Sequence, residues 1–147
     1  MIANWLHISI VHLAVIGIPL VTFRIFTLRN EPLDSKSWRN SFLVIIGLAV
    51  ITGIAYSTGP ETVEHTKQVV GAYSQDQVEW HALWGRIVLI LQVIAGLLGV
   101  MGLASILQEE TPDRRIYLIL LILSVTNSFI VLYTAHLGGF IRRADLL

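Results

Sequence analysis

The sequence predicts an all-α integral membrane protein, a four-helix bundle whose helices run up-down-up-down. Hydrophobic residues make up 54% of its 147 residues and charged residues 14%, whereas an ordinary soluble domain carries about 25% charged residues. Four apolar segments are long enough to cross a bilayer, since roughly 20 residues span its hydrocarbon core. These segments are residues 5–26, 41–58, 84–107 and 116–141. They use most of the chain, so we expect one transmembrane domain over residues 1–147.

The spans follow one another with short connections. The first begins without a basic region or a clear small-residue cleavage site, so we expect it to be a retained helix rather than a signal peptide. The second is expected to stop at "TGPET", because Pro60 and Glu61 suit the first turn of a new helix. Residues 62–70 then predict a short extramembrane helix that ends at "GAYS". In "SQDQ", Ser74 and Gln77 form a capping pattern, which predicts that the third helix begins before it enters the lipid.

Basic residues predict the orientation of the bundle. Six lie at the connections after the first and third spans, namely Arg24, Arg29, Lys36, Arg39, Arg114 and Arg115. The other four, Lys67, Arg86, Arg142 and Arg143, lie on the opposite side. The positive-inside rule predicts that the first group is cytoplasmic and that both termini are on the outer side of the membrane.

Composition excludes several classes of function. A net charge of zero gives no indication of a nucleic-acid partner. The chain contains no cysteine, which excludes disulfides, thiolate metal sites, iron–sulfur clusters and covalent haem attachment. It also lacks the motifs of zinc proteases, serine hydrolases and phosphate-binding loops.

The five histidines fall on one side of the membrane. His7 and His12 lie in the first half of span one, His65 follows span two, His81 precedes span three and His136 is near the end of span four. Any one of them alone is most simply a solvated residue, or one paired with a hydroxyl or carbonyl group of a neighbouring helix. His12 and His136 are different, because each lies inside an apolar run, where an ionisable group points to function. At 1.5 Å per residue both are about 8–10 Å from the helix end.

Two chemistries use neutral imidazoles from facing helices. Haem b takes two axial histidines in a helical bundle and needs no cysteine. A transition-metal site would combine the histidines with carboxylates such as Glu64 and Glu79. A structural accessory subunit without a cofactor is the third alternative.

Residues near the histidines favour haem. A flat porphyrin needs gaps between helices, which glycines provide, and its propionates pair with arginines at the interface. The glycines are Gly85, Gly138 and Gly139, and the arginines are Arg86, Arg142 and Arg143. Trp80, Trp84 and Tyr133 would wall the ring. The simpler alternative is that interfacial tryptophans and arginines anchor the protein in the bilayer.

Four short motifs resemble a known family. They are "VHLAVIGIPL", "ETVEHTKQVV", "VEWHALWGRI" and "HLGGFI". They resemble a domain-of-unknown-function family of small four-helix bacterial membrane proteins, with Val-His-Phe-Pro-Ile in the first helix and Gly-Gly near the end of the last. The resemblance implies haem b binding in the company of respiratory or copper-handling proteins. It matches His12, His65, His81, Gly138 and Gly139.

Two departures from the family pattern bear on the ligands. Leu13 and Ala14 replace Phe-Pro, and "FIRR" stands where many members have Leu-Val-Tyr. With His136 two residues before the glycine pair, this predicts a fourth ligand and cationic partners for propionates.

Four ligands would serve two haems. Pairing across the bundle joins His12 with His81 and His65 with His136. If only one haem is bound, the more deeply placed His12 and His136 are an alternative ligand pair to the two pairings above. His7 is not expected to serve the same iron as His12, because five residues turn a helix by about 140° from its starting direction.

The sequence therefore predicts a membrane-embedded b-type cytochrome-like electron-transfer subunit. It would carry one or two bis-histidine haems near the periplasmic face. We expect it to carry electrons rather than to catalyse a reaction of its own. A larger respiratory or photosynthetic complex would hold it, with other subunits or a periplasmic cytochrome as partners.

Overall fold

Four long helices account for the fold. The computed structural model describes the backbone of residues 2–70 and 75–142 and the side chains of residues 7–65 and 75–141. Its helices are α1 (Ile2–Thr27), α2 (Lys36–Val70), α3 (Gln75–Leu107) and α4 (Arg114–Arg142). All four are long and apolar enough to cross a membrane, and the described residues contain no strand. The all-α membrane four-helix bundle predicted from the sequence is confirmed.

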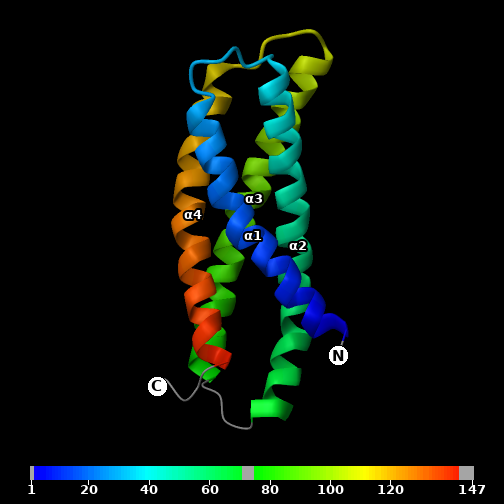
Figure 1. Cartoon of the computed structure of the whole chain (residues 1–147), viewed down its shortest axis with the longest axis vertical. Helices are drawn as coiled ribbons and strands as arrows, with labels where there is room; N and C mark the ends of the chain where they lie inside the picture. Colours follow the sequence, from blue (N-terminus) through cyan, green and yellow to red (C-terminus); the bar gives the residue numbers. More distant parts are fainter. Residues whose placement is uncertain (1, 71–74, 143–147) are drawn as a thin grey trace.

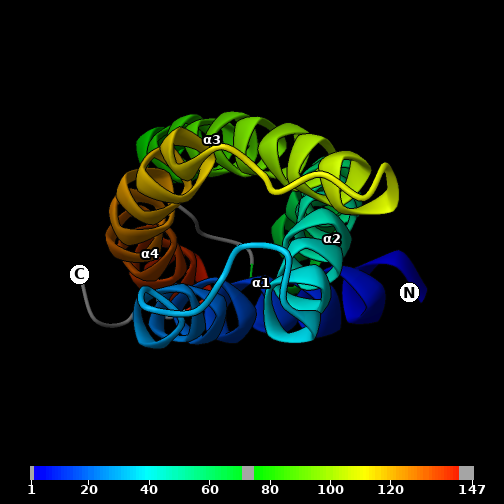
Figure 2. The ribbon, with the colours of Figure 1, turned by 90° about the horizontal axis from the view of Figure 1, so that it is seen from above.

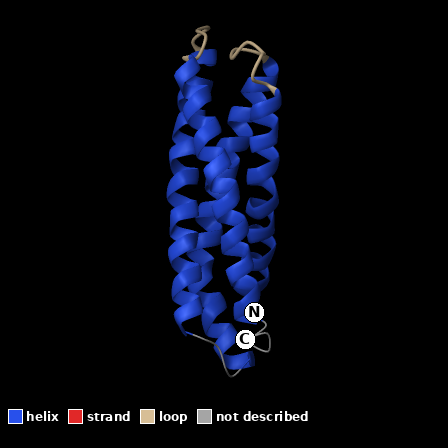
Figure 3. Ribbon diagram, turned by 90° about the vertical axis from the view of Figure 1, so that its left-hand side faces the viewer, coloured by secondary structure: helices blue, strands red, loops and turns tan. Residues whose placement is uncertain are grey.

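The helices alternate in direction and form a closed ring. Each packs against the next in the chain, and α4 packs back against α1. The start of α1 and the end of α4 therefore lie at the same end of the bundle (Figures 1 and 3). The helices α1 and α3 face each other diagonally, as do α2 and α4 (Figure 2).

The short extramembrane helix predicted after the second span is not a separate element. Instead, α2 runs unbroken through Pro60 to Val70. Proline removes one backbone hydrogen bond, but its fixed φ is itself helical, so the chain on both sides can stay in one helix. Thr62, two residues on, donates its hydroxyl to the Thr58 carbonyl at 3.2 Å. The extramembrane helix is thus the last part of α2.

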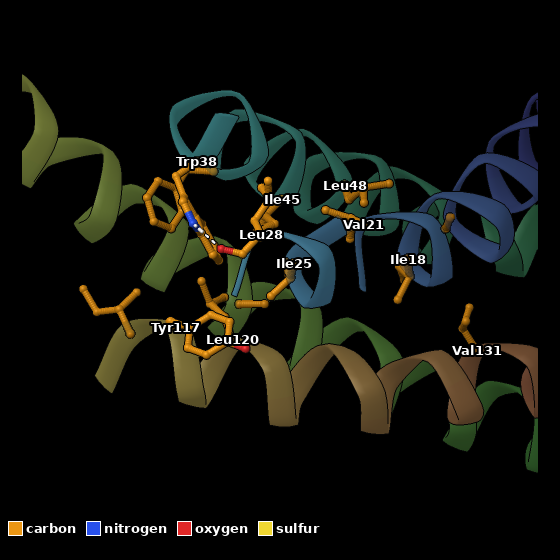
Figure 4. Packing of buried hydrophobic residues seen from close by; sticks show 14 of the residues in the cluster. Ile18, Val21, Ile25, Leu28, Trp38, Ile45, Leu48, Tyr117, Leu120 and Val131 are labelled. Atoms are coloured by element: carbon orange, nitrogen blue, oxygen red, sulfur yellow. Dashed lines mark hydrogen bonds between the residues drawn. The ribbon is translucent and has the colours of Figure 1, made fainter. Parts of the chain in front are cut away.

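The core is tightest at the end of the bundle opposite the termini. Trp38 is fully buried and donates its indole N–H to the Leu28 carbonyl at 3.2 Å (Figure 4). Its ring centroid lies 5.6 Å from Tyr117 in an edge contact and 5.5 Å from Phe42. These contacts tie α2 and α4 to the loop after α1.

Glycines bring α2 and α3 close together. A Cβ atom at Gly96 would lie 2.7 Å from that of Ala49, and one at Gly102 would lie 2.5 Å from the Phe42 ring. Neither position has room for a side chain. The close approach expected of glycines in membrane helices is thus present along this interface.

Candidate functional site

The first imidazole of the candidate site is His7 of α1. Its ring is half-buried, and Nδ1 lies 2.9 Å from the Ala55 carbonyl and 3.1 Å from the Thr58 hydroxyl, both on α2. A carbonyl oxygen can only accept, so Nδ1 carries the proton and donates to Ala55. In the neutral ring Nε2 then keeps its lone pair.

The second imidazole is His81 of α3. Its half-buried ring has Nδ1 3.0 Å from the Thr134 carbonyl of α4. The same reasoning puts the proton on Nδ1 and leaves Nε2 with a lone pair. Two part-buried histidines thus share one tautomer, each set by a backbone carbonyl of an adjacent helix.

His7 and His81 come from helices on opposite sides of the ring. Their carbonyl partners belong to α2 and α4, the other diagonal pair. All four helices therefore contribute to this site, which lies at the end of the bundle that holds the termini. We call His7 and His81 the histidine pair.

Glycines leave room beside both rings. A Cβ atom at Gly138 would lie 3.0 Å from His81 Cε1 and 3.3 Å from its Nδ1, closer than ordinary contact. One at Gly59 would lie 3.7 Å from His7 Cε1. Gly139 is exposed and a Cβ there would meet nothing within 4 Å, while Gly85 would only touch Thr134 at 4.0 Å. Of the three predicted gap residues, Gly138 is the one against an imidazole.

Two polar atoms near His81 have no protein partner among the described residues. They are the side-chain oxygen of Gln77 and the indole N–H of Trp84, and both are inaccessible to solvent. Gln77 precedes His81 by four residues and Trp84 follows it by three, so the three side chains share one face of α3. Trp84 also makes an edge contact with Tyr133 of α4, at 5.2 Å between centroids. This face carries unused hydrogen-bonding capacity beside the histidine pair.

The two histidines predicted to ligate haem from inside the apolar spans, His12 and His136, do not belong to this site. His12 is exposed on the surface of α1, where its Nδ1 donates to the Ile8 carbonyl of its own helix at 2.6 Å. His136 is exposed on α4, with its ring edge-on to Phe140 at 4.6 Å. The structure therefore brings neither His12 with His81 nor His12 with His136 into one interior site. His65 is half-buried near the end of α2, and its predicted pairing with His136 is likewise not formed, because His136 faces outward.

His7 and His12 point in different directions from α1, as expected, and the inward-facing residue is His7. The buried stripe of α1 consists of Ala14, Ile18, Val21 and Ile25, spaced by three or four residues. Extending this stripe backwards by seven residues from Ala14 reaches His7 and bypasses His12. The sequence alone does not mark this stripe, because the exposed positions of α1 are equally apolar.

The same spacing of buried residues identifies the inward-facing positions of α3 and α4. Buried residues of α3 recur at Val88 and Ala95, and seven residues before Val88 is His81. On α4 the stripe through Val131 and Thr134 continues to Gly138 and omits His136.

The predicted accessory residues have mixed positions. Arg86 is exposed and donates Nε–H to the Tyr56 hydroxyl at 3.2 Å, linking α3 to α2. Trp80 is 55% exposed, so it does not wall an interior site. The side chain of Arg142 and the whole of Arg143 lie outside the described residues, as does the predicted cap Ser74.

A carboxylate-rich metal cage does not form in the described part of the chain. No group of three or more histidine, aspartate or glutamate side chains is placed there to hold a metal ion. Glu79 accepts a hydrogen bond from Gln75 at 3.0 Å instead.

No family model, no curated protein and no solved structure matches the chain. The family resemblance of its short motifs stays a prediction. The geometry of the histidine pair is therefore the basis for assigning a function.

Proposed function

We propose that the chain is a membrane-embedded b-type cytochrome-like electron-transfer subunit whose haem b iron is ligated by His7 and His81. The observation that carries this proposal is the shared tautomer of two part-buried imidazoles on diagonally opposed helices. A bis-histidine haem in a helical bundle uses ligands from facing helices. Its ligands keep Nε2 for the iron while Nδ1–H donates to a carbonyl or carboxylate.

The surrounding residues fit a porphyrin in three ways. Gly59 and Gly138 present no side chain to the imidazoles. The unpartnered indole N–H of Trp84 lies on the face of α3 that carries His81, where it would donate to a propionate of the ring. Trp84 and Tyr133 supply aromatic surface to the same region.

The cofactor would supply one-electron chemistry without making or breaking bonds to the protein. The residues of the chain hold two imidazoles in a fixed tautomer and orientation. The carbonyls of Ala55 and Thr134 increase the basicity of the ligands through Nδ1–H, which favours the oxidised metal. The apolar spans exclude water from the ring.

The location of the pair determines where electrons would be exchanged. The site lies near the end of the bundle that holds the termini, which the distribution of basic residues places on the periplasmic side of a bacterial inner membrane. A partner would therefore be a periplasmic cytochrome or a neighbouring subunit of a respiratory or photosynthetic complex. We propose this membrane and orientation together with the function.

The test is a dithionite-reduced minus oxidised absorption spectrum with pyridine haemochrome quantitation on protein from a haem-replete host. The proposal expects b-type bands that are lost in His7→Ala and in His81→Ala. His12→Ala and His136→Ala are the matched controls, because both histidines are exposed on the same helices that carry the site or its partner carbonyl. Loss of haem in these controls, with retention in His7→Ala, would restore the ligand set predicted from the motifs.

Protein without porphyrin would refute the proposal. Elemental analysis then separates the remaining alternatives. Bound copper or zinc that depends on His7 and His81 would indicate a metal-binding or transport module. The lack of both haem and metal would indicate a structural subunit.

A further inference from the structure

A threonine hydroxyl faces one member of the histidine pair. Thr58 of α2 lies with its Oγ1 3.1 Å from His7 Nδ1, and the Ala55 carbonyl oxygen lies 2.9 Å from the same nitrogen. Thr58 and Ala55 are three positions apart, so they share one face of α2. The ring of His7 therefore has two oxygen neighbours on one helix at a single nitrogen.

The hydroxyl proton of Thr58 is used within α2. It is donated to the Ile54 carbonyl at 3.0 Å or to the Ala55 carbonyl at 3.1 Å, and both oxygens can only accept. If Thr58 donated to His7 instead, Nδ1 would be unprotonated and its lone pair would face the Ala55 carbonyl oxygen at 2.9 Å. Thr58 is therefore an acceptor, and the Nδ1–H of His7 is shared between a carbonyl and a hydroxyl oxygen in a three-centre hydrogen bond.

His81 is held in a different way. Its Nδ1 lies 3.0 Å from the Thr134 carbonyl oxygen. The Thr134 hydroxyl donates to the Ile130 carbonyl of its own helix at 2.8 Å. Thr134 thus holds His81 through its backbone, whereas α2 holds His7 through a backbone oxygen and a side-chain oxygen.

We propose, on the basis of the function proposed above, that the Thr58 hydroxyl is a positioning group that sets the reduction potential of the haem site by making His7 the more basic of the two ligands. Acceptors at the second ring nitrogen fix the ring orientation and raise the basicity of a metal-ligating histidine. A more basic imidazole stabilises the oxidised iron, and hydrogen bonding of this kind is one of the means by which a protein sets a haem potential. Thr58 therefore keeps the potential more negative than the Ala55 carbonyl alone would.

The first measurement is the midpoint potential of Thr58→Ala and Thr58→Ser, which differ by one hydroxyl oxygen. The potential of Thr58→Ala should shift to more positive values, and Thr58→Ser should restore the wild-type value. Thr52→Ala is the matched control, because Thr52 is a buried threonine of the same helix whose hydroxyl donates to the Leu48 carbonyl at 2.7 Å. Equal potentials in the two Thr58 variants would overturn the proposal, as would an equal shift in Thr52→Ala.

A second measurement does not depend on haem. Nuclear magnetic resonance of dithionite-treated protein labelled with ¹⁵N-histidine reports the Nδ1–H group of His7, identified by its loss in His7→Gln. Its proton resonance should move upfield in Thr58→Ala, because the proton loses an acceptor, and should return in Thr58→Ser. An unmoved resonance would overturn the proposal even in protein that binds haem. A moved resonance in protein without haem would support the positioning of His7 by Thr58 and would refute the proposed function alone.

Discussion

Two adjacent glycines provide a matched test of the histidine pair. At Gly138 a new Cβ would lie 3.0 Å from His81 Cε1, whereas at Gly139 it would meet nothing within 4 Å. Carbon atoms prefer a separation of about 3.5–4.0 Å, so in Gly138→Ala the ring must withdraw by roughly 0.5 Å or more. That movement strains or breaks the 3.0 Å bond from Nδ1 to the Thr134 carbonyl.

The magnitude follows from the bond at risk. A hydrogen bond of this kind contributes about 0.5–1.5 kcal/mol of net stability. Replacing a helical glycine by alanine stabilises a helix by up to about 1 kcal/mol, and this contribution cancels between the two variants. Gly138→Ala should therefore be less stable than Gly139→Ala by about 1 kcal/mol.

Two assays measure the effect in detergent micelles. Thermal unfolding followed by circular dichroism should show a lower Tm for Gly138→Ala, by roughly 2–4 °C for each kcal/mol in a chain of this size. The reduced minus oxidised spectrum should show reduced haem occupancy in Gly138→Ala alone. Equal Tm values and equal spectra would refute the placement of His81 against Gly138.

Three further predictions concern the bundle. Gly96→Ala puts a Cβ 2.7 Å from a methyl carbon of α2, so overpacking should make it about 1–3 kcal/mol less stable than Gly53→Ala, where the space is open, as measured by denaturant unfolding. Trp38→Phe removes the indole bond to the Leu28 carbonyl, which still accepts from the Glu31 backbone N–H at 2.9 Å, so the same assay should show a loss of about 0.5–1.5 kcal/mol, and an unchanged value would contradict that contact. Because the chain has no cysteine, a single Asn30→Cys variant reports topology. A membrane-impermeant maleimide should label this cysteine only after the cells are opened, because Asn30 is expected on the cytoplasmic side. In a separate Gln75→Cys variant, at the first residue of α3, the maleimide should label intact cells. The reverse result would invert the orientation.

The sequence alone determined the four spans and the common side of the histidines. Each span must be apolar and helical along its whole length, because lipid cannot satisfy backbone polar groups. Alternating directions then place His7, His65, His81 and His136 at one end of the bundle, whatever the packing. These conclusions need only length and hydropathy.

The tertiary structure decided which histidines face inward. In a soluble helix the polar face marks the outside, but lipid is as apolar as the core, so polarity does not distinguish the two faces. Helix rotation therefore follows from packing, and packing turned His7 inward and left His12 exposed on the surface of α1. It likewise placed Gly138, but not Gly139, against an imidazole. Close contact between helices depends on shape, which the hydropathy of a membrane span does not record.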